Sequence, residues 1–389
     1  MSKIKKYITF GAPKIEKEEI KEVIDSLKSR WIGTGPKVAK FEEIIKNYTG
    51  SKYAISLNSC TAALHLSLLA CGIERGDEVI TSPLTFAATA NTIIHVGAKP
   101  VFVDIKKETM NIDEDLIEKA ITDKTKAIIP VHMAGRPCEM DKIMKVAKKH
   151  NLYVIEDAAQ AIGAEYKSKK IGSIGDLTCF SFYVTKNITT GEGGMITTTR
   201  KDWTEKIRIY RLHGMSKDAW KRYGDSGYKH YDFIYPGYKY NLTDIAAAIG
   251  IHQMAKIDSF DERRREIWEY YNENLEDLPI ILPPKWPEYI KHARHLYTVL
   301  IDKKRAGVSR DEFMQKMHEA GIGTGVHFNP VHLHSYYRNN FHYKKSNFPN
   351  AEFIGERTVS IPLSPVLTGL EVKKITETIR KIIIKRRYI

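Results

Sequence analysis

The sequence has 389 residues, 42% of them apolar, which is enough to bury a sizeable core and favours one large domain with a smaller one. Its 61 Lys and Arg against 47 Asp and Glu give a formal net charge of +14, spread along the whole chain. The apolar patch at the start of the chain is short and broken by Gly and Pro, so we expect no secretory signal, no membrane span and a cytoplasmic location. The four cysteines show no Cys-x-x-Cys spacing and no partnering His cluster, so we expect free thiols and no metal.

Short β-branched runs alternate with helical stretches in the first part of the chain. The expected strands are 53–57, 77–81, 100–105, 126–131 and 152–157. The helical stretches between them include 61–72, 86–97 and 139–150. A repeated βα pattern predicts an α/β fold with a mostly parallel, doubly wound sheet.

Two further β runs, 176–183 and 193–199, flank Lys186 and place it in a loop at the end of a strand. A long helical stretch over 242–275 then leads into a Pro-rich segment. After it, a β run, a helix over 309–321 and the run 322–328 indicate a second, smaller α/β unit. We therefore predict a large domain over 1–255 and a small C-terminal α/β domain over 256–389.

The one dense basic cluster is the tail "KKITETIRKIIIKRRYI" at 373–389. Its spacing favours an amphipathic helix with a solvated basic face over a lipid-binding or nucleic-acid-binding segment. Because no recognisable nucleic-acid module accompanies it, we expect neither a nucleic acid nor a membrane as partner.

Three segments end at the edge of the sheet where ligands of open α/β folds collect, outside the carboxyl ends of the strands. In the first, Ser59 and Thr61 lie where a strand gives way to a helix, so free N–H groups and hydroxyls could hold a phosphate. The same residues are also ordinary helix N-caps. The second segment brings Asp157 directly after an apolar strand, where a buried carboxylate needs a cationic partner unless it only caps the junction.

The third segment contributes Lys186, followed by "NITTGEGG". A lysine in a semi-apolar pocket has a neutral amine available as a nucleophile, although an isolated lysine is more often a surface residue. The glycines after it let backbone approach a ligand closely. A phosphate site, a strand-end acid and a loop lysine together are the parts that hold pyridoxal 5'-phosphate as a Schiff base.

Several long stretches extend this pattern over most of the chain. They include "WIGTGPKVAKFEE", "NSCTAALHLSLLACGI", "VIEDAAQAIGAEY", "CFSFYVTKNITTGEGGMITT", "GYKYNLTDIAAAIGIHQ" and "VHFNPVH". With them the sequence resembles the DegT/StrS family of pyridoxal-phosphate-dependent nucleotide-sugar aminotransferases, from about residue 8 into the small domain. The resemblance implies the aspartate-aminotransferase-like fold, fold type I, and a homodimer with active sites at its interface.

The resemblance also implies roles for individual residues. Lys186 is the lysine bonded to the cofactor, Asp157 pairs with the ring nitrogen and Gln160 hydrogen-bonds the phenolic oxygen. The remaining cofactor-binding residues are Phe86, which stacks on the ring, Ser181 and the Cys60–Thr61 turn, which bind the phosphate, and Asn241, which reaches the phosphate of the neighbouring subunit.

Two residues are expected on the substrate side, each with an alternative explanation. His327 resembles the family's substrate-side histidine, but a structural role is as good an explanation. Trp31 could form part of the sugar pocket or simply pack before a Gly-rich turn.

The activity implied is transfer of an amino group from glutamate to a nucleotide-linked 4-keto-6-deoxy sugar, UDP- or dTDP-linked. Amination at carbon three is an alternative, since only "TTGEGGM" favours carbon four. A pyridoxamine-dependent sugar dehydratase would have histidine in place of Lys186. A non-catalytic regulator would have lost the cofactor residues, and this sequence retains them.

Overall fold

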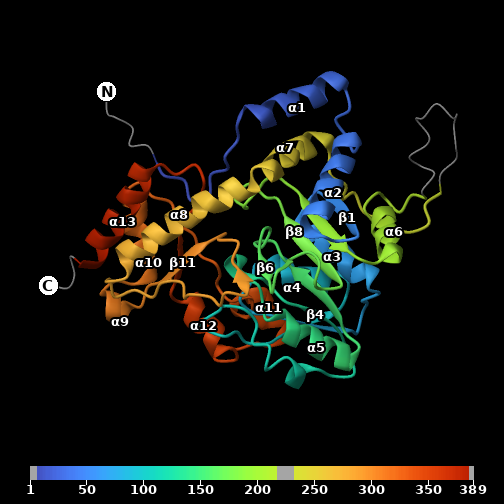
Figure 1. The fold of residues 1–389 in the computed structure, drawn as a ribbon. Coiled ribbons are helices and arrows are strands. Elements are labelled where there is room, and N and C mark those ends of the chain that lie inside the picture. The colour runs from blue at the N-terminus through green and yellow to red at the C-terminus, as the bar shows by residue number, and fades with distance from the viewer. Residues whose placement is uncertain (1–6, 217–231, 385–389) are drawn as a thin grey trace.

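The computed structural model describes residues 7–216 and 232–384. Its centre is a seven-stranded sheet with the strand order β1-β9-β8-β5-β4-β2-β3 (Figure 1). The strands are β1 (Tyr53–Leu57), β2 (Glu78–Thr81), β3 (Lys99–Phe102), β4 (Thr125–Ile129), β5 (Tyr153–Asp157), β8 (Leu177–Ser181) and β9 (Gly194–Thr198). Only β9 runs antiparallel to its neighbours, β1 and β8. The predicted mostly parallel sheet is confirmed.

Helices cover both faces of this sheet. They are α2 (Pro36–Thr49), α3 (Cys60–Ala70), α4 (Ala87–His95), α5 (Met140–His150), α6 (Lys201–Tyr210) and α7 (Asp244–Ala255), while α1 (Lys17–Ser29) packs on the outer side of α7. Successive strand residues point to opposite faces, so Ile128 packs in the cluster with α2, α5 and α7, whereas Ala127 and Ile129 pack in the cluster with α3 and α6. Burial on both faces explains why the strands are apolar throughout.

A separate hydrophobic core, which we call the C-terminal cluster, lies outside the sheet. It joins buried residues of α8 (Ile257–Leu275), β11 (Tyr297–Leu300), α10 (Arg310–Glu319), β12 (Thr358–Ile361) and α13 (Gly369–Ile384). Ile8 from the start of the chain packs in this cluster and bridges to Ile322. The first turn of α8, with Ile257 and Phe260, packs in the cluster with α2, α5 and α7 instead. The boundary at residue 255 stays a prediction.

Shorter elements connect these parts. They are β6 (Glu165–Tyr166), β7 (Lys169–Lys170), β10 (Ile290–Lys291), α9 (Lys303–Ala306), α11 (Ser335–Phe341), α12 (Pro349–Gly355) and the 3-10 turns Glu118–Ala120, Met133–Gly135 and Val331–Leu333. The strands β11 and β12 pair antiparallel as a two-stranded sheet.

Two predicted elements differ in detail. The helical stretch 242–275 is two helices, because Lys256 leaves the helical backbone conformation between α7 and α8. The run 322–328 forms no strand and pairs only through isolated bridges at Ile322 and Gly325. Glycines at Gly323 and Gly325 weaken a strand there, because they add backbone freedom without side-chain packing.

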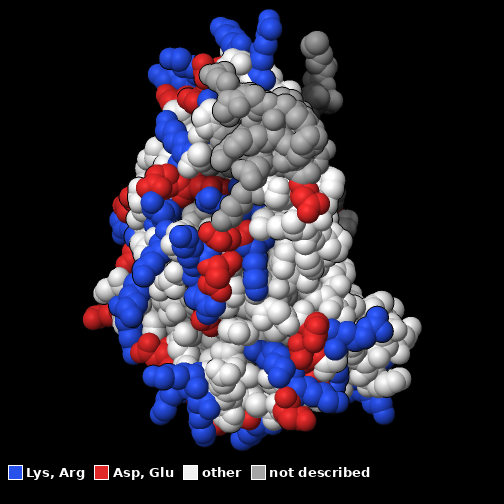
Figure 2. Space-filling model, turned by 90° about the vertical axis from the view of Figure 1, so that its right-hand side faces the viewer, with Lys and Arg blue, Asp and Glu red and all other residues white. Residues whose placement is uncertain are grey.

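Charged residues of both signs share the surface. On the face in Figure 2, Lys and Arg side chains lie interspersed with Asp and Glu and leave a broad uncharged area. In the basic tail, α13 buries Ile375, Ile379 and Ile383, as an amphipathic helix does, and residues 385–389 lie outside the described part. Within residues 7–216 and 232–384 no helix has the length and apolar character needed to cross a membrane.

Candidate active site

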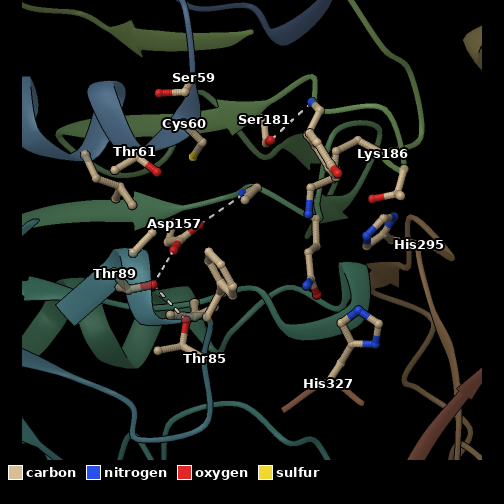
Figure 3. Close-up of a pocket in the computed structure, with 18 of the residues that line it drawn as sticks. Ser59, Cys60, Thr61, Thr85, Thr89, Asp157, Ser181, Lys186, His295 and His327 are labelled. Carbon is tan, nitrogen blue, oxygen red and sulfur yellow. Dashed lines mark hydrogen bonds between the residues drawn. The ribbon is translucent and has the colours of Figure 1, made fainter. Parts of the chain in front are cut away.

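A cavity of about 480 Å³ lies at the carboxyl ends of β5 and β8. In the view of Figure 3, Ser59, Cys60, Thr61 and Asp157 lie on one side of it and Lys186, His295 and His327 on the other. Of the predicted site residues, those that line the cavity are Cys60, Thr61, Phe86, Asp157, Gln160, Ser181, Lys186 and His327.

The start of α3 forms one wall of the cavity. Ser59 is the N-cap of this helix, and its hydroxyl accepts the N–H of Ala62 at 3.1 Å. The other N–H groups of the first turn have no partner within the helix, and the positive end of the helix dipole lies with them. Thr61 is exposed in this first turn. The sequence suggested either a helix N-cap or a phosphate site for this segment. The two roles are compatible, because the Ser59 hydroxyl caps the helix while other N–H groups stay free to bind an anion.

Gly194 at the start of β9 brings backbone against this same helix end. A Cβ atom placed on Gly194 would lie 2.3 Å from the carbonyl oxygen of Ser59 and 2.7 Å from the amide nitrogen of Cys60. Glycine is required here for protein packing, whereas the sequence alone indicated close approach to a ligand.

Asp157 ends β5 and is 6% exposed. Its carboxylate accepts hydrogen bonds from the Thr89 hydroxyl at 2.7 Å and from the amide of Ala159 at 3.1 Å (Figure 3). Burial raises the pKa of Asp157, while the two hydrogen bonds and the positive charge of Lys186 act in the opposite direction. No lysine, arginine or histidine in the described ranges forms a salt bridge with this carboxylate, so it can pair with a cationic ligand.

Lys186 lies in the connection between β8 and β9, where its amide donates to the carbonyl of Tyr183. Burial lowers the pKa of the Lys186 amine, and the nearby Cys60 and Asp157 only partly offset this effect. A lowered pKa increases the share of neutral amine, the form that attacks a carbonyl.

Gln160 and Ser181 present polar atoms to the cavity. The side-chain oxygen of Gln160 accepts the N–H of Ala134 at 2.6 Å, which leaves the amide nitrogen as the donor for a ligand. Ser181 ends β8, and its hydroxyl oxygen lies 3.3 Å from the amide nitrogen of Tyr183. Phe86, just before α4, is 64% exposed, which leaves its ring available for stacking.

His327 reaches the cavity from the segment between α10 and α11. Its Nδ1 lies 2.8 Å from the Ser360 hydroxyl, and its ring stacks on Phe10. Burial and the charge of Lys186 lower the pKa of His327 to about 4, so the imidazole is neutral at physiological pH.

Two predicted residues lie outside this cavity. Asn241 donates to the Thr34 hydroxyl at 2.6 Å and accepts from Lys239 at 2.6 Å. Trp31 is 55% exposed, and its indole N–H donates to the carbonyl of Thr34. Neither residue lines the cavity of its own chain.

The cavity residues that were not predicted include Thr85, Thr89 and His295. The Nδ1 of His295 lies 2.9 Å from the side-chain oxygen of Asn187, whose nitrogen donates to Ala293. Nδ1 therefore carries the proton, and Nε2 is an acceptor. The four-residue spacing of Thr85 and Thr89 at a helix start could have indicated that their hydroxyls lie on the same side. Nothing near His295 in the sequence points to the cavity.

Comparison with known proteins identifies the family. The profile of the DegT/DnrJ/EryC1/StrS aminotransferase family matches residues 13–380. The chain belongs to this family. It is 58% identical over 375 residues to protein MJ1066 of Methanocaldococcus jannaschii, with 96% of this chain and 97% of that protein covered. It is 49% identical over 378 residues to the spore coat polysaccharide biosynthesis protein SpsC of Bacillus subtilis, with 97% of both chains covered.

Solved structures of this family share the fold. The putative sugar aminotransferase Spr1654 of Streptococcus pneumoniae, in its PLP form, has a TM-score of 0.90 and 36% identity, covering 97% of this chain and 99% of that chain. Helicobacter pylori PseC, an aminotransferase involved in pseudoaminic acid biosynthesis, has a TM-score of 0.90 and 31% identity, covering 98% and 100%. The chain is thus a pyridoxal-phosphate-dependent sugar aminotransferase of fold type I, as the sequence predicted.

The donors in the cavity fit this cofactor. A buried carboxylate that forms no salt bridge in the described ranges suits a protonated ring nitrogen, and a helix N-terminus suits a phosphate. Lys186, with its lowered pKa, suits a covalent bond to an aldehyde.

Proposed function

We propose that this aminotransferase moves an amino group from glutamate to a nucleotide-linked 4-keto-6-deoxy sugar, UDP- or dTDP-linked, and makes a 4-amino sugar for surface glycan or related biosynthesis. The observation that carries the proposal is the meeting of Lys186, Asp157 and the start of α3 around one cavity in a chain of the sugar aminotransferase family.

Each protein group has a distinct task in this proposal. Bound pyridoxal 5'-phosphate supplies the electron sink through which the amino group is taken up and passed on. Lys186 would hold the cofactor covalently and, once released, its amine would act as the base and acid that moves a proton from and to the carbon that bears the amino group. Asp157 holds a proton on the ring nitrogen, and Gln160 orients the phenolic oxygen. The start of α3 and Ser181 bind the phosphate.

Two relatives support a glycan-directed substrate. SpsC takes part in making a spore coat polysaccharide, and PseC takes part in making pseudoaminic acid. This chain is similar to both over nearly its whole length, so we extend the same substrate class to it.

We further propose a homodimer in which Asn241 completes the partner's phosphate site. Asn241 lies outside the cavity of its own chain. Ile20, Ile24 and Leu27 on α1 are 54%, 45% and 54% exposed and share one side of the helix, which is typical of a surface that packs against another chain.

The test is a glutamate-dependent assay of the purified holoenzyme across UDP-, dTDP- and GDP-linked 4-keto-6-deoxy sugars and their 3-keto counterparts. We expect 2-oxoglutarate to form with a UDP- or dTDP-linked sugar, and NMR of the product to place the amine on carbon four. Turnover of the 3-keto sugars in place of the 4-keto sugars would support the alternative regiochemistry. Loss of a hydroxyl without consumption of glutamate would support a dehydratase, and no reaction with any 3- or 4-keto nucleotide sugar would overturn the proposal.

A further inference from the structure

A chain of buried hydroxyls ends on the carboxylate of Asp157. The hydroxyl of Thr85 lies 2.7 Å from that of Thr89, which lies 2.7 Å from Oδ2 of Asp157 (Figure 3). Thr85 is 2% exposed and Thr89 is fully buried. Both threonines line the cavity, with Thr89 in the first turn of α4 and Thr85 just before this helix.

The direction of each hydrogen bond follows from the acid at the end of the chain. An ionised carboxylate only accepts, so the hydroxyl of Thr89 donates to Asp157. The one hydrogen of Thr89 is then used, so Thr85 must donate to Thr89. Oδ1 of Asp157 accepts the amide of Ala159. Each carboxylate oxygen thus has one protein donor and keeps lone pairs for a ligand.

This arrangement matters because the site opposes ionisation of Asp157. Burial raises its pKa, and the hydroxyl of Thr89 is the strongest of the influences that lower it again. The other titratable groups around the carboxylate are Lys186 in the loop after β8, His132 after β4, Cys60 at the start of α3 and Cys179 on β8. Substitution of Thr89 leaves all of these unchanged.

We propose that Thr89, held by Thr85, is a positioning residue that keeps Asp157 ionised and aimed at the ring nitrogen of the cofactor. The inference rests on the role proposed for Asp157. Without the Thr89 hydroxyl, the buried carboxylate of Asp157 would be more stable if it took up a proton or turned away from the cavity. Either change would leave the ring nitrogen less protonated.

The experiment compares Thr89→Val with Thr92→Val. Thr92 lies on the same helix and is fully buried, but its hydroxyl donates to the backbone carbonyl of Thr89 and not to Asp157. Both variants are reconstituted with pyridoxal 5'-phosphate labelled with ¹⁵N in the ring. The ¹⁵N chemical shift then reports the protonation of the ring nitrogen without any sugar substrate.

For Thr89→Val we expect a ¹⁵N shift toward the unprotonated value and a kcat about tenfold lower, the factor that a hydrogen bond to an ionised group is worth, with KM little changed. Thr89→Ser keeps the hydroxyl and should recover most of both losses. Thr85→Val should give a smaller change of the same sign, and it serves as the test if Thr89→Val does not fold. Thr92→Val should behave as wild type.

The variant Asp157→Asn distinguishes a failure of the role proposed for Thr89 from a failure of the role proposed for Asp157. If Asp157→Asn abolishes ring protonation while Thr89→Val and Thr85→Val match Thr92→Val, the positioning role is wrong and the role of Asp157 stands. If Asp157→Asn also leaves the ¹⁵N signal unchanged, the role proposed for Asp157 fails, and the inference fails with it.

Discussion

Burial moves the pKa values of two cavity residues in opposite directions, because it disfavours whichever form is charged. It lowers the pKa of Lys186 and raises that of Asp157. The two groups therefore need a ligand that can take the lysine amine as a covalent partner and offer the carboxylate a positive charge. Pyridoxal 5'-phosphate offers both.

Removal of Lys186 tests this pairing directly. Lys186→Ala should still bind the cofactor through the phosphate site but lose turnover by about 10²–10⁴-fold or more, the usual contribution of proton transfer. Borohydride should fix the cofactor on the peptide that contains Lys186 in wild type and on no peptide in the variant, as mass spectrometry would show. Lys167→Ala, an exposed lysine, is the control. Labelling of any other lysine would contradict the assignment.

The residues of this site differ in how far the sequence could predict them. Asp157 ends β5 and Lys186 lies in the connection after β8, so the strand pattern alone places both at the same edge of the sheet. His295 lines the cavity and is held there by a hydrogen bond to Asn187, which is 108 residues away in sequence. No local pattern encodes a contact of that separation, which depends on how the segment before β11 packs against the sheet.

At the level of elements, the contact between the start of β9 and the start of α3 predicts a sensitive position. Gly194→Ala would force a methyl group into the Ser59 carbonyl and displace the helix end that we propose binds the phosphate. We expect a loss of about 1–3 kcal/mol in the free energy of unfolding, the usual range for overpacking, together with weaker cofactor binding.

Urea unfolding and a cofactor titration measure the two effects. Gly369→Ala is the matched control, because a Cβ there would meet no atom within 4 Å. If Gly194→Ala is as stable as the control and binds the cofactor as tightly as wild type, the contact has no such role.

Lys256 between α7 and α8 fixes α1 to the end of α7. Its ammonium lies 2.9 Å from Glu19, which is 1% exposed, and also pairs with Glu16 and Glu18. Despite burial, hydrogen bonds from Lys256 and Gln253 leave the pKa of Glu19 lowered. An acid with a lowered pKa adds stability above its unfolded pKa of about 4.3, and this stability is lost as the pH falls through the folded value.

Lys256→Met should therefore destabilise the protein by about 2–3 kcal/mol at pH 7, because it leaves the buried Glu19 without its cation. The difference from wild type should shrink below about pH 4, where Glu19 takes up a proton. Urea unfolding at both pH values measures it, with the exposed Lys17→Met as control. A difference that is independent of pH would mean that lost packing, and not charge, is the cause.

Strand periodicity predicted the elements well where strands are buried on both faces. The expected run 152–157 is β5 (Tyr153–Asp157), and 53–57 is β1. Prediction failed where the signal was a short apolar run with glycines, as at 322–328, which pairs only at single residues. It also missed the break at Lys256, since continuous helical periodicity gives no sign of a residue that leaves the helix.

For the whole molecule, the position of Asn241 outside its own cavity predicts complementation between subunits. Lys186→Ala and Asn241→Ala proteins should each be inactive, and subunit exchange should restore one intact site in each mixed dimer. With equal amounts and random exchange, about a quarter of wild-type activity should return in a two-fold symmetric dimer. Full activity of Asn241→Ala alone, or an active monomer in sedimentation, would rule out the shared site.

Both ends of the described chain enter the C-terminal cluster, through Ile8 at one end and Ile383 at the other. A mechanical load applied at either terminus is therefore borne first by this cluster and reaches the central sheet only after the cluster yields. An ATP-driven unfoldase that pulls on a terminal tag would meet the same first barrier from both directions. The sheet that carries Lys186 and Asp157 would be the last part of the molecule to feel the force.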